Sequence, residues 1–330
     1  MEKRMSRKAK MITVAGLLLL FYGMFLSIRL GARDISAEEI FHAFFAYEGT
    51  LNDKLVTGVR LPRMLSGVLT GGLLALAGCM MQGVLKNPLA EPSMLGVTQG
   101  AAFAVALATA FPAACGAAGK FSMALAGAGI SGIVLFLFTL RGKKGSMEKL
   151  LLAGTAMSTF FLSLASIVAL LTNRSQELAF WVAGGLRQAG WRQVVFLAGI
   201  GGICDFWAIA LAGKLNIISI GEEAATGLGV APEKVKIQML GCLVPICAVC
   251  VAAAGNISFI GLFVPHIVRK LIGGDYRILM PVSFLYGSVT LVFADLAARI
   301  FFAPYELPVG LFTAAVGVPF FLMLVRKEKN

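Results

Sequence analysis

Ten stretches that are nearly free of charged residues constrain the fold of this chain more than any other feature. Most are about 20 residues long, which is the length that an α-helix needs to cross about 30 Å of hydrocarbon; the eighth is shorter and is weakly delimited by Gly261 and Pro265. Only 14% of the residues are charged, whereas a soluble domain carries about a quarter. The sequence therefore predicts an all-α polytopic membrane protein, with spans at roughly 11–30, 61–84, 94–112, 121–140, 150–171, 193–213, 236–254, 258–273, 279–301 and 308–325.

The distribution of lysine and arginine predicts how these spans are oriented. An even number of spans places both termini on one side, and if that side is the cytoplasm, 19 of the 29 cations lie there. The positive-inside rule then favours cytoplasmic termini in the cell membrane. The apolar run Met11–Ile28 is longer than the core of a signal peptide, so we expect a retained first span. No polar stretch is long enough for a second domain, so residues 1–330 form one transmembrane domain with a cytoplasmic loop at 213–235.

The positions of the cations and cysteines argue against two other classes of protein. The net charge is +12, but the cations lie scattered between apolar runs instead of gathering on one face, as they do in a nucleic-acid binder. The six cysteines lie mostly inside the spans, and Cys247 and Cys250 form a CxxC without other ligand types nearby. The chain has only two histidines, so it offers no zinc-site spacing. We expect no nucleic-acid partner, no metal site and no cofactor.

Several short segments beside the spans combine charge with proline or glycine. In IGEEAATGLGV, residues 220–230, Glu222 and Glu223 suit the start of a helix, and Gly227 and Gly229 suit its end. This pattern predicts a short helix at the cytoplasmic membrane surface, which is either an interfacial helix or a contact for another protein. The other segments are RLPR at 60–63, GCMMQ at 78–82, KNPLAEP at 86–92, GLFVPHIVR at 261–269, ADLAAR at 294–299 and ELPVG at 306–310.

Taken together and in this order, the segments resemble the permease subunits of binding-protein-dependent ABC importers for iron–siderophore, haem and cobalamin. The similarity runs from about residue 11 to residue 325. It implies that two copies stand side by side around a translocation path, with two ATPase subunits on the cytoplasmic side and a binding protein outside. The chain has no G-x-x-x-x-G-K-[ST] stretch, so we expect ATP to be hydrolysed by the separate subunits. Ferric siderophore is the favoured substrate, with haem and cobalamin as the other candidates.

The resemblance also implies roles for cytoplasmic residues. The predicted short helix would be the coupling helix that fits a cleft in the ATPase, and Asn87 and Leu89 would lie at the cytoplasmic constriction of the pathway. His266 and Arg269 match a family motif and have either a structural or a functional role. The residues assigned to ATPase coupling are Gly221, Glu222, Glu223, Ala224, Gly227 and Gly229.

Three arginines on the predicted outer side receive a role from the same resemblance. Arg60, Arg63 and Arg299 match family positions that pair with glutamates of the binding protein. From the residues alone, snorkelling at helix ends is the simpler interpretation. Arg299 also lies one helical turn after Asp295, so an internal ion pair is open as well.

Asp205 departs from the rest of the pattern, because it is a carboxylate in the middle of the sixth predicted span. Such a group costs about 2.5–3.5 kcal/mol on insertion scales and usually faces a bundle interior. We expect it to point toward neighbouring helices and to find a hydrogen-bond partner. The alternative function that it raises is an ion-coupled secondary transporter, with Asp205 as the coupling site.

Overall fold

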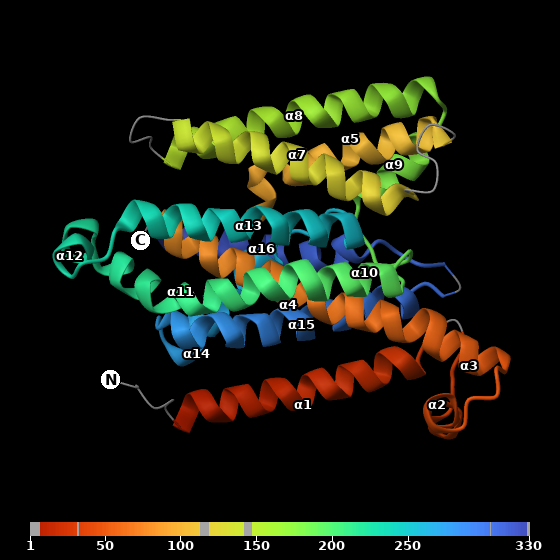
Figure 1. Cartoon of the computed structure of the whole chain (residues 1–330). Helices are drawn as coiled ribbons and strands as arrows, with labels where there is room; N and C mark the ends of the chain where they lie inside the picture. Colours follow the sequence, from red (N-terminus) through yellow and green to blue (C-terminus); the bar gives the residue numbers. More distant parts are fainter. Residues whose placement is uncertain (1–6, 32, 113–118, 142–146, 304, 329–330) are drawn as a thin grey trace.

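The computed structural model describes residues 7–31, 33–112, 119–141, 147–303 and 305–328, and in these ranges the regular structure is helical. The long helices run side by side in one bundle (Figure 1). The α-helices are α1 (Arg7–Arg29), α2 (Ala37–Phe45), α3 (Leu51–Leu55), α4 (Leu61–Leu85), α5 (Val97–Ala110), α7 (Gly119–Arg141), α8 (Met147–Leu171), α9 (Ser175–Val182), α10 (Trp191–Phe196), α11 (Gly202–Ile220), α12 (Glu222–Gly227), α13 (Pro232–Ala254), α14 (Ile260–Ile272), α15 (Tyr276–Ile300) and α16 (Val309–Glu328).

Every predicted span coincides with a helix, and the prediction of an all-α polytopic membrane protein is confirmed. Among the described residues, 7 helical segments are long and apolar enough to cross a membrane. Two of them are composite: α3 and α4 run on through a π-helical turn as Leu51–Leu85, and α10 and α11 do so as Trp191–Ile220. The helices α5 and α14 have only 14 and 13 residues. At 1.5 Å per residue each covers about 20 Å, which is less than the hydrocarbon thickness.

Helix α4 lies at the centre of the bundle and is buried along almost its whole length. Its small residues allow neighbouring backbones to approach closely, which favours helix packing in membranes. A Cβ atom on Gly71 would lie 2.3 Å from the carbonyl oxygen of Gly287 in α15, and one on Gly78 would lie 1.8 Å from that of Gly261 in α14. The glycines of α4 therefore form a packing surface against α14 and α15.

A second group of helices, α5, α7 and α8, packs together at one side of the bundle, next to α13 (Figure 1). Helix α13 contacts both α4 and α7 and so joins the two groups. It is buried over most of its length, and Cys242, Cys247 and Cys250 lie on it as core residues.

Some predicted loops contain helices. Helices α2 and α3 lie between the predicted spans 11–30 and 61–84, and α9 follows α8. Ser36 and Glu39 form a capping box at the start of α2, a signal that is visible in the sequence as S-x-x-E. Helix α11 also continues to Ile220, beyond the predicted end at residue 213. The composite segment that it closes has 30 residues, about 45 Å, so it extends past the membrane.

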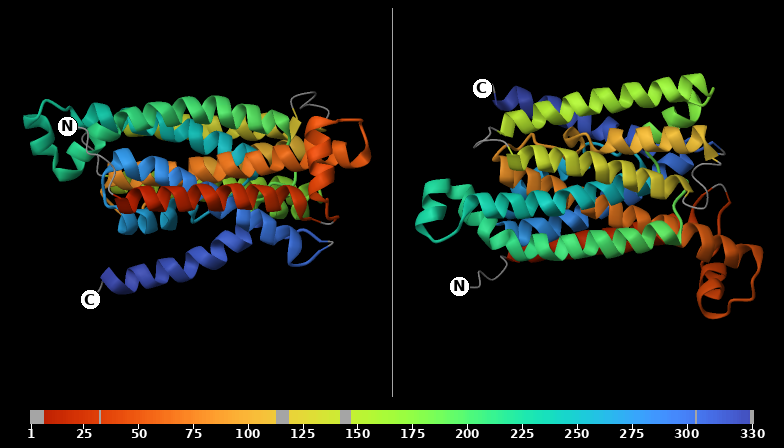
Figure 2. Two further views of the ribbon diagram at one scale, coloured as in Figure 1. Left: turned by 90° about the horizontal axis from the view of Figure 1, so that it is seen from below. Right: turned by 45° about the horizontal axis from the view of Figure 1, so that its top comes forward.

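The bundle has two distinct ends, which we name after one helix at each (Figures 1 and 2). At the α12 end lie α12, the first turn of α1 and the last turn of α16. At the α9 end lie α2, α3 and α9. The start of the first long helix and the end of the last one thus share an end with the predicted surface helix.

Candidate functional site

Arg63, in the first turn of α4, is the centre of a buried ion network at the α9 end. Its Nη2 donates to Oδ1 of Asp295 at 2.9 Å, and its Nη1 donates to Oε1 of Glu306 at 2.9 Å. Asp295 is 2% exposed and Arg63 is 8% exposed. The network therefore ties the start of α4 to α15 and to the segment that precedes α16.

Arg299 and Arg60 are bound in the same region. Nε of Arg299 lies 3.2 Å from Oδ2 of Asp295, and its Nη2 donates to Oγ of Ser27 at 2.7 Å. Arg60 donates to the carbonyl oxygens of Arg29, the last residue of α1, and of Arg33, four residues later. The internal pair between Arg299 and Asp295, which the sequence left open, is confirmed.

The three arginines lie at one end of the bundle, as expected. The residues are 6–8% exposed, and carboxylate, hydroxyl and carbonyl groups of the chain itself already accept hydrogen bonds from their guanidinium groups. Whether they take part in docking stays a prediction, and direct pairing would require each to leave these acceptors.

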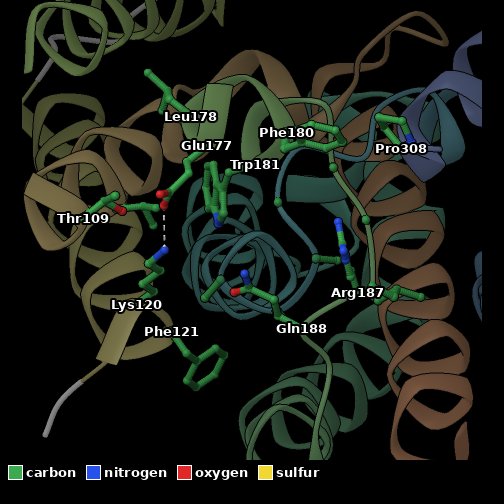
Figure 3. Close-up of a pocket in the computed structure, with 18 of the residues that line it drawn as sticks. Thr109, Lys120, Phe121, Glu177, Leu178, Phe180, Trp181, Arg187, Gln188 and Pro308 are labelled. Atoms are coloured by element: carbon green, nitrogen blue, oxygen red, sulfur yellow. Dashed lines mark hydrogen bonds and ion pairs between the residues drawn. The ribbon is translucent and has the colours of Figure 1, made fainter. Parts of the chain in front are cut away.

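A cavity of about 790 Å³ opens at the α9 end (Figure 3). Close backbone contacts hold its walls: Gly185 N–H donates to the oxygen of Ala254 at 2.8 Å, and Val309 N–H donates to that of Gly184 at 3.0 Å. Gly184 has a φ of +72° and a Cβ there would lie 2.4 Å from a carbonyl oxygen, so only glycine fits. The segment after α9 is thereby fixed against the end of α13 and the start of α16.

The lining of this cavity combines apolar residues with many cations. It includes Trp181 and Phe180 of α9 together with Gln188, and five cations: Arg63, Lys120, Arg174, Arg187 and Arg192. Lys120 Nζ and Arg174 Nη1 contact Glu177 at 3.0 and 2.5 Å. The hydrogen bonds from Lys120 and Arg174 lower the pKa of Glu177, and the bond from Lys120 has the larger effect. Sequence reasoning missed this site, although the cations and aromatic residues between the fifth and sixth predicted spans signalled it.

Helix α12 offers a different kind of surface at the other end. Its residues Glu222, Glu223, Ala224, Thr226 and Gly227 are exposed, and only Ala225 is buried. Gly229 follows with a φ of +74°, and Val230 N–H donates to the oxygen of Ala225 at 2.9 Å, which closes the helix end. Oε1 of Glu222 lies 2.8 Å from Nζ of Lys236, and this hydrogen bond lowers the pKa of Glu222. The helix is anchored at few points and presents most of its surface outward.

The predicted pathway residues lie in the turn after α4. Asn87 is exposed and its Oδ1 accepts a hydrogen bond from the Leu89 N–H at 2.9 Å. Four residues after Asn87, the buried carboxylate of Glu91 accepts from the Phe259 N–H at the start of α14. Asn87 and Leu89 therefore sit in an ordered turn that is tied to α14.

Comparison with known proteins decides the family. The profile of the FecCD transport family matches residues 18–327, which is nearly the whole chain. The chain belongs to the FecCD transport family. It is 41% identical to the iron(3+)-hydroxamate import system permease protein FhuB of Bacillus subtilis, over 98% of this chain and 84% of that protein. It is 37% identical to the ferric enterobactin transport system permease protein FepD of Escherichia coli, over 96% of both chains.

A solved structure agrees with this assignment. A metal-chelate type ABC transporter in an inward-facing conformation superposes with a TM-score of 0.83 at 28% identity. The match covers 96% of this chain and 99% of that one. This FecCD-family chain is thus a multi-pass membrane protein whose helical arrangement is that of a solved transporter subunit.

The expectation for Asp205 is wrong in one respect. The residue is half-buried on α11, but its Oδ1 is buried without a hydrogen-bond partner among the described residues. Gly201 and Ala208, one turn before and after Asp205 on the same face of the helix, are buried. The side chain therefore points toward neighbouring helices, as expected, but the expected hydrogen-bond partner of Oδ1 is missing.

The histidine and cysteine residues belong to no cluster that could hold a metal ion in the part of the chain that the structure describes. No group of three or more metal-ligand side chains occurs there, and the five described cysteines are free; Cys115 lies outside the described residues. His266 packs edge-on against Phe320 with ring centroids 5.5 Å apart. Arg269 lies over the ring of Tyr276 at 5.2 Å. These contacts favour the structural role for His266 and Arg269.

Proposed function

We propose that this chain is the permease subunit of an ATP-driven, binding-protein-dependent importer of iron chelates. The observation that carries the proposal is the FecCD match over residues 18–327. The relatives named above support it, since one is named for ferric hydroxamates and one for ferric enterobactin. A ferric siderophore is accordingly the favoured cargo, with haem and cobalamin as alternatives.

The two ends of the bundle suggest how the subunit is placed in an assembly. We infer that the α12 end faces the cytoplasm, because most lysine and arginine residues lie on that side of the spans. Two copies would stand side by side in the cell membrane, with two ATPase subunits below them. The exposed α12, with Gly221–Gly229 around it, would fit a cleft in the ATPase. Residues 213–235, which carry this helix, would belong to the same single domain 1–330.

The α9 end would then face outward and receive the binding protein. The buried network of Arg60, Arg63 and Arg299 supports this role indirectly, because it fixes the ends of α1, α4 and α15 relative to one another. Asn87 and Leu89, in the ordered turn at the opposite end, would stand near the inner exit of the pathway.

The ion-coupled alternative rests on Asp205 alone. A coupling carboxylate usually has a partner such as another acid, a histidine or a backbone carbonyl, and Asp205 Oδ1 has none among the described residues. ATP hydrolysis is expected in the separate ATPase subunits. The ATP-driven mechanism therefore has the stronger support.

The test is uptake of a ⁵⁵Fe-labelled chelate into proteoliposomes that contain this chain, its ATPase and its binding protein. We expect uptake that requires ATP and the binding protein and that continues when ionophores remove all ion gradients. Asp205→Asn should transport at nearly the normal rate. Uptake that runs on an ion gradient without ATP, and stops in Asp205→Asn, would replace the proposal by the alternative.

A further inference from the structure

The geometry points to the cavity at the α9 end as a binding site for an anionic iron chelate, with Arg187 and Trp181 as its principal donors. This inference rests on the proposed function and deepens it, because it commits the cargo to one charge class. A permease with such a site would accept negatively charged ferric complexes better than neutral ones.

The charge of the lining is the first argument. Five cations and two acids, Glu177 and Glu306, line the cavity, which leaves a formal charge of +3. The positive charge of Arg63 is neutralised by its ion pairs with Glu306 and Asp295. Glu177 is shared between Lys120 and Arg174, so it offsets only one of them. Arg187, in the segment between α9 and α10, therefore adds to a lining that already has more cations than acids.

Arg187 contributes to the positive charge of the lining, and its side chain is not held by the rest of the described chain. Its side chain is exposed, and no hydrogen bond or ion pair holds it among the described residues. Arg192 is held differently: its Nη2 donates to Oγ of Ser122 at 2.7 Å, and its guanidinium lies 5.7 Å from the centre of the Phe121 ring. Arg187 is thus the cation that is free to turn toward a ligand.

Trp181 and Gln188 add neutral donors on the facing walls (Figure 3). The indole N–H of Trp181 has no hydrogen-bond partner among the described residues, and a half-buried indole usually finds one. Its ring also lines the cavity, where it would contact an aromatic chelating group. The cavity volume of about 790 Å³ lies in the range of pockets that enclose small-molecule ligands.

The net charge of a ferric chelate decides how well it would bind in this cavity. Three hydroxamate groups neutralise a ferric ion, whereas three doubly charged catecholates leave the complex strongly negative. A cavity with surplus cations and unpaired N–H donors complements the second kind and gains little from the first. In a site partly shielded from water such charge contacts are strong.

The experiment measures binding of two ⁵⁵Fe probes to the permease–ATPase complex in nanodiscs by equilibrium dialysis at low salt. The probes are ferric enterobactin, a tris-catecholate, and ferrichrome, a neutral trihydroxamate. We expect the tris-catecholate to bind at least about tenfold more tightly, and its binding to weaken as salt rises. Equal or tighter binding of the neutral probe would overturn the inference.

Variants locate the site. Arg187→Gln should weaken tris-catecholate binding about tenfold and leave the neutral probe within about twofold, while Arg187→Lys should restore most of the loss. Glu177→Gln should strengthen binding of the tris-catecholate, because it removes an acid from the lining. Lys54→Gln is the matched control, since Lys54 is an exposed cation at the same end but outside the cavity.

Two outcomes separate this inference from the proposed function. ATP-dependent uptake of iron without any preference for the anionic probe would overturn the inference alone. The absence of ATP-dependent uptake for every chelate would overturn the proposed function. If Arg187→Gln reduces capture of the binding protein but changes neither dissociation constant, Arg187 belongs to a docking surface and the inference is wrong.

Discussion

The two ends of the bundle use charged residues in opposite ways. At the α9 end, Arg63, Arg299 and Asp295 are 2–8% exposed and bind one another and the backbone. At the α12 end, Glu222 is exposed and its ion pair with Lys236 joins α12 to α13 at the surface. The first arrangement holds distant parts of the chain together, and the second leaves a short helix free to meet another protein.

We therefore expect the two ends to contribute to different properties: the α9 end to stability, and the α12 end to coupling with the ATPase. Removing one partner of a buried ion pair typically costs about 3–5 kcal/mol, because the other charge stays buried. Removing one partner of an exposed pair costs about 0.2–1 kcal/mol. Substitutions at the α9 network should therefore act on folding, whereas substitutions on α12 should act on transport in a folded protein.

The largest effect is expected for Arg63→Glu. The substitution removes the cation that joins Asp295 and Glu306 and adds a third carboxylate beside them. We expect a loss of at least about 3–5 kcal/mol in stability, seen as a low yield of folded protein and a lower unfolding temperature in detergent. A variant that unfolds like the wild type but captures less binding protein would show instead that Arg63 is a docking residue.

A smaller effect is expected for Ser27→Ala, at the edge of the same network. The change removes Oγ as the acceptor of Arg299 Nη2 at 2.7 Å, and a hydrogen bond to a charged group contributes about 1.5–3 kcal/mol. Thermal unfolding in detergent measures this loss of stability. Thr13→Val is the matched control, because the Thr13 hydroxyl bonds a carbonyl of its own helix, α1. Equal unfolding temperatures of the two variants would contradict the network's role.

The smallest effect on stability is expected for Glu222→Ala. The pair with Lys236 is partly exposed, so we expect a loss of only about 0.2–1 kcal/mol. Because the folded protein lowers the pKa of Glu222, this contribution is present above the unfolded pKa of about 4.3 and is lost as the pH falls through the folded pKa. The difference in unfolding temperature from wild type should thus be constant between about pH 6 and 8 and vanish in acid. A difference that grows toward pH 8 would rule out this pair as its cause.

The spans and α12 could be predicted from the sequence, whereas the buried ion network and the cavity could not. Hydropathy placed the spans, and the acidic pair followed by glycines placed α12, because both signals are local. The partners of Arg63 lie 232 and 243 residues away, so only the packing of α4 against α15 reveals them. The residues of the cavity come from several helices, and no spacing along the chain brings them together.

The measurement that tests the account most directly compares one substitution on α12 with one beside it. Ala224 is exposed on α12, and Lys234 is exposed in the first turn of α13. We predict that Ala224→Arg unfolds within about 0.5 kcal/mol of wild type, keeps its chelate binding, and loses ATP-driven iron uptake in proteoliposomes by at least about tenfold, while Lys234→Gln transports normally. Full uptake by Ala224→Arg would contradict the assignment of α12 as the surface that couples this permease to its ATPase.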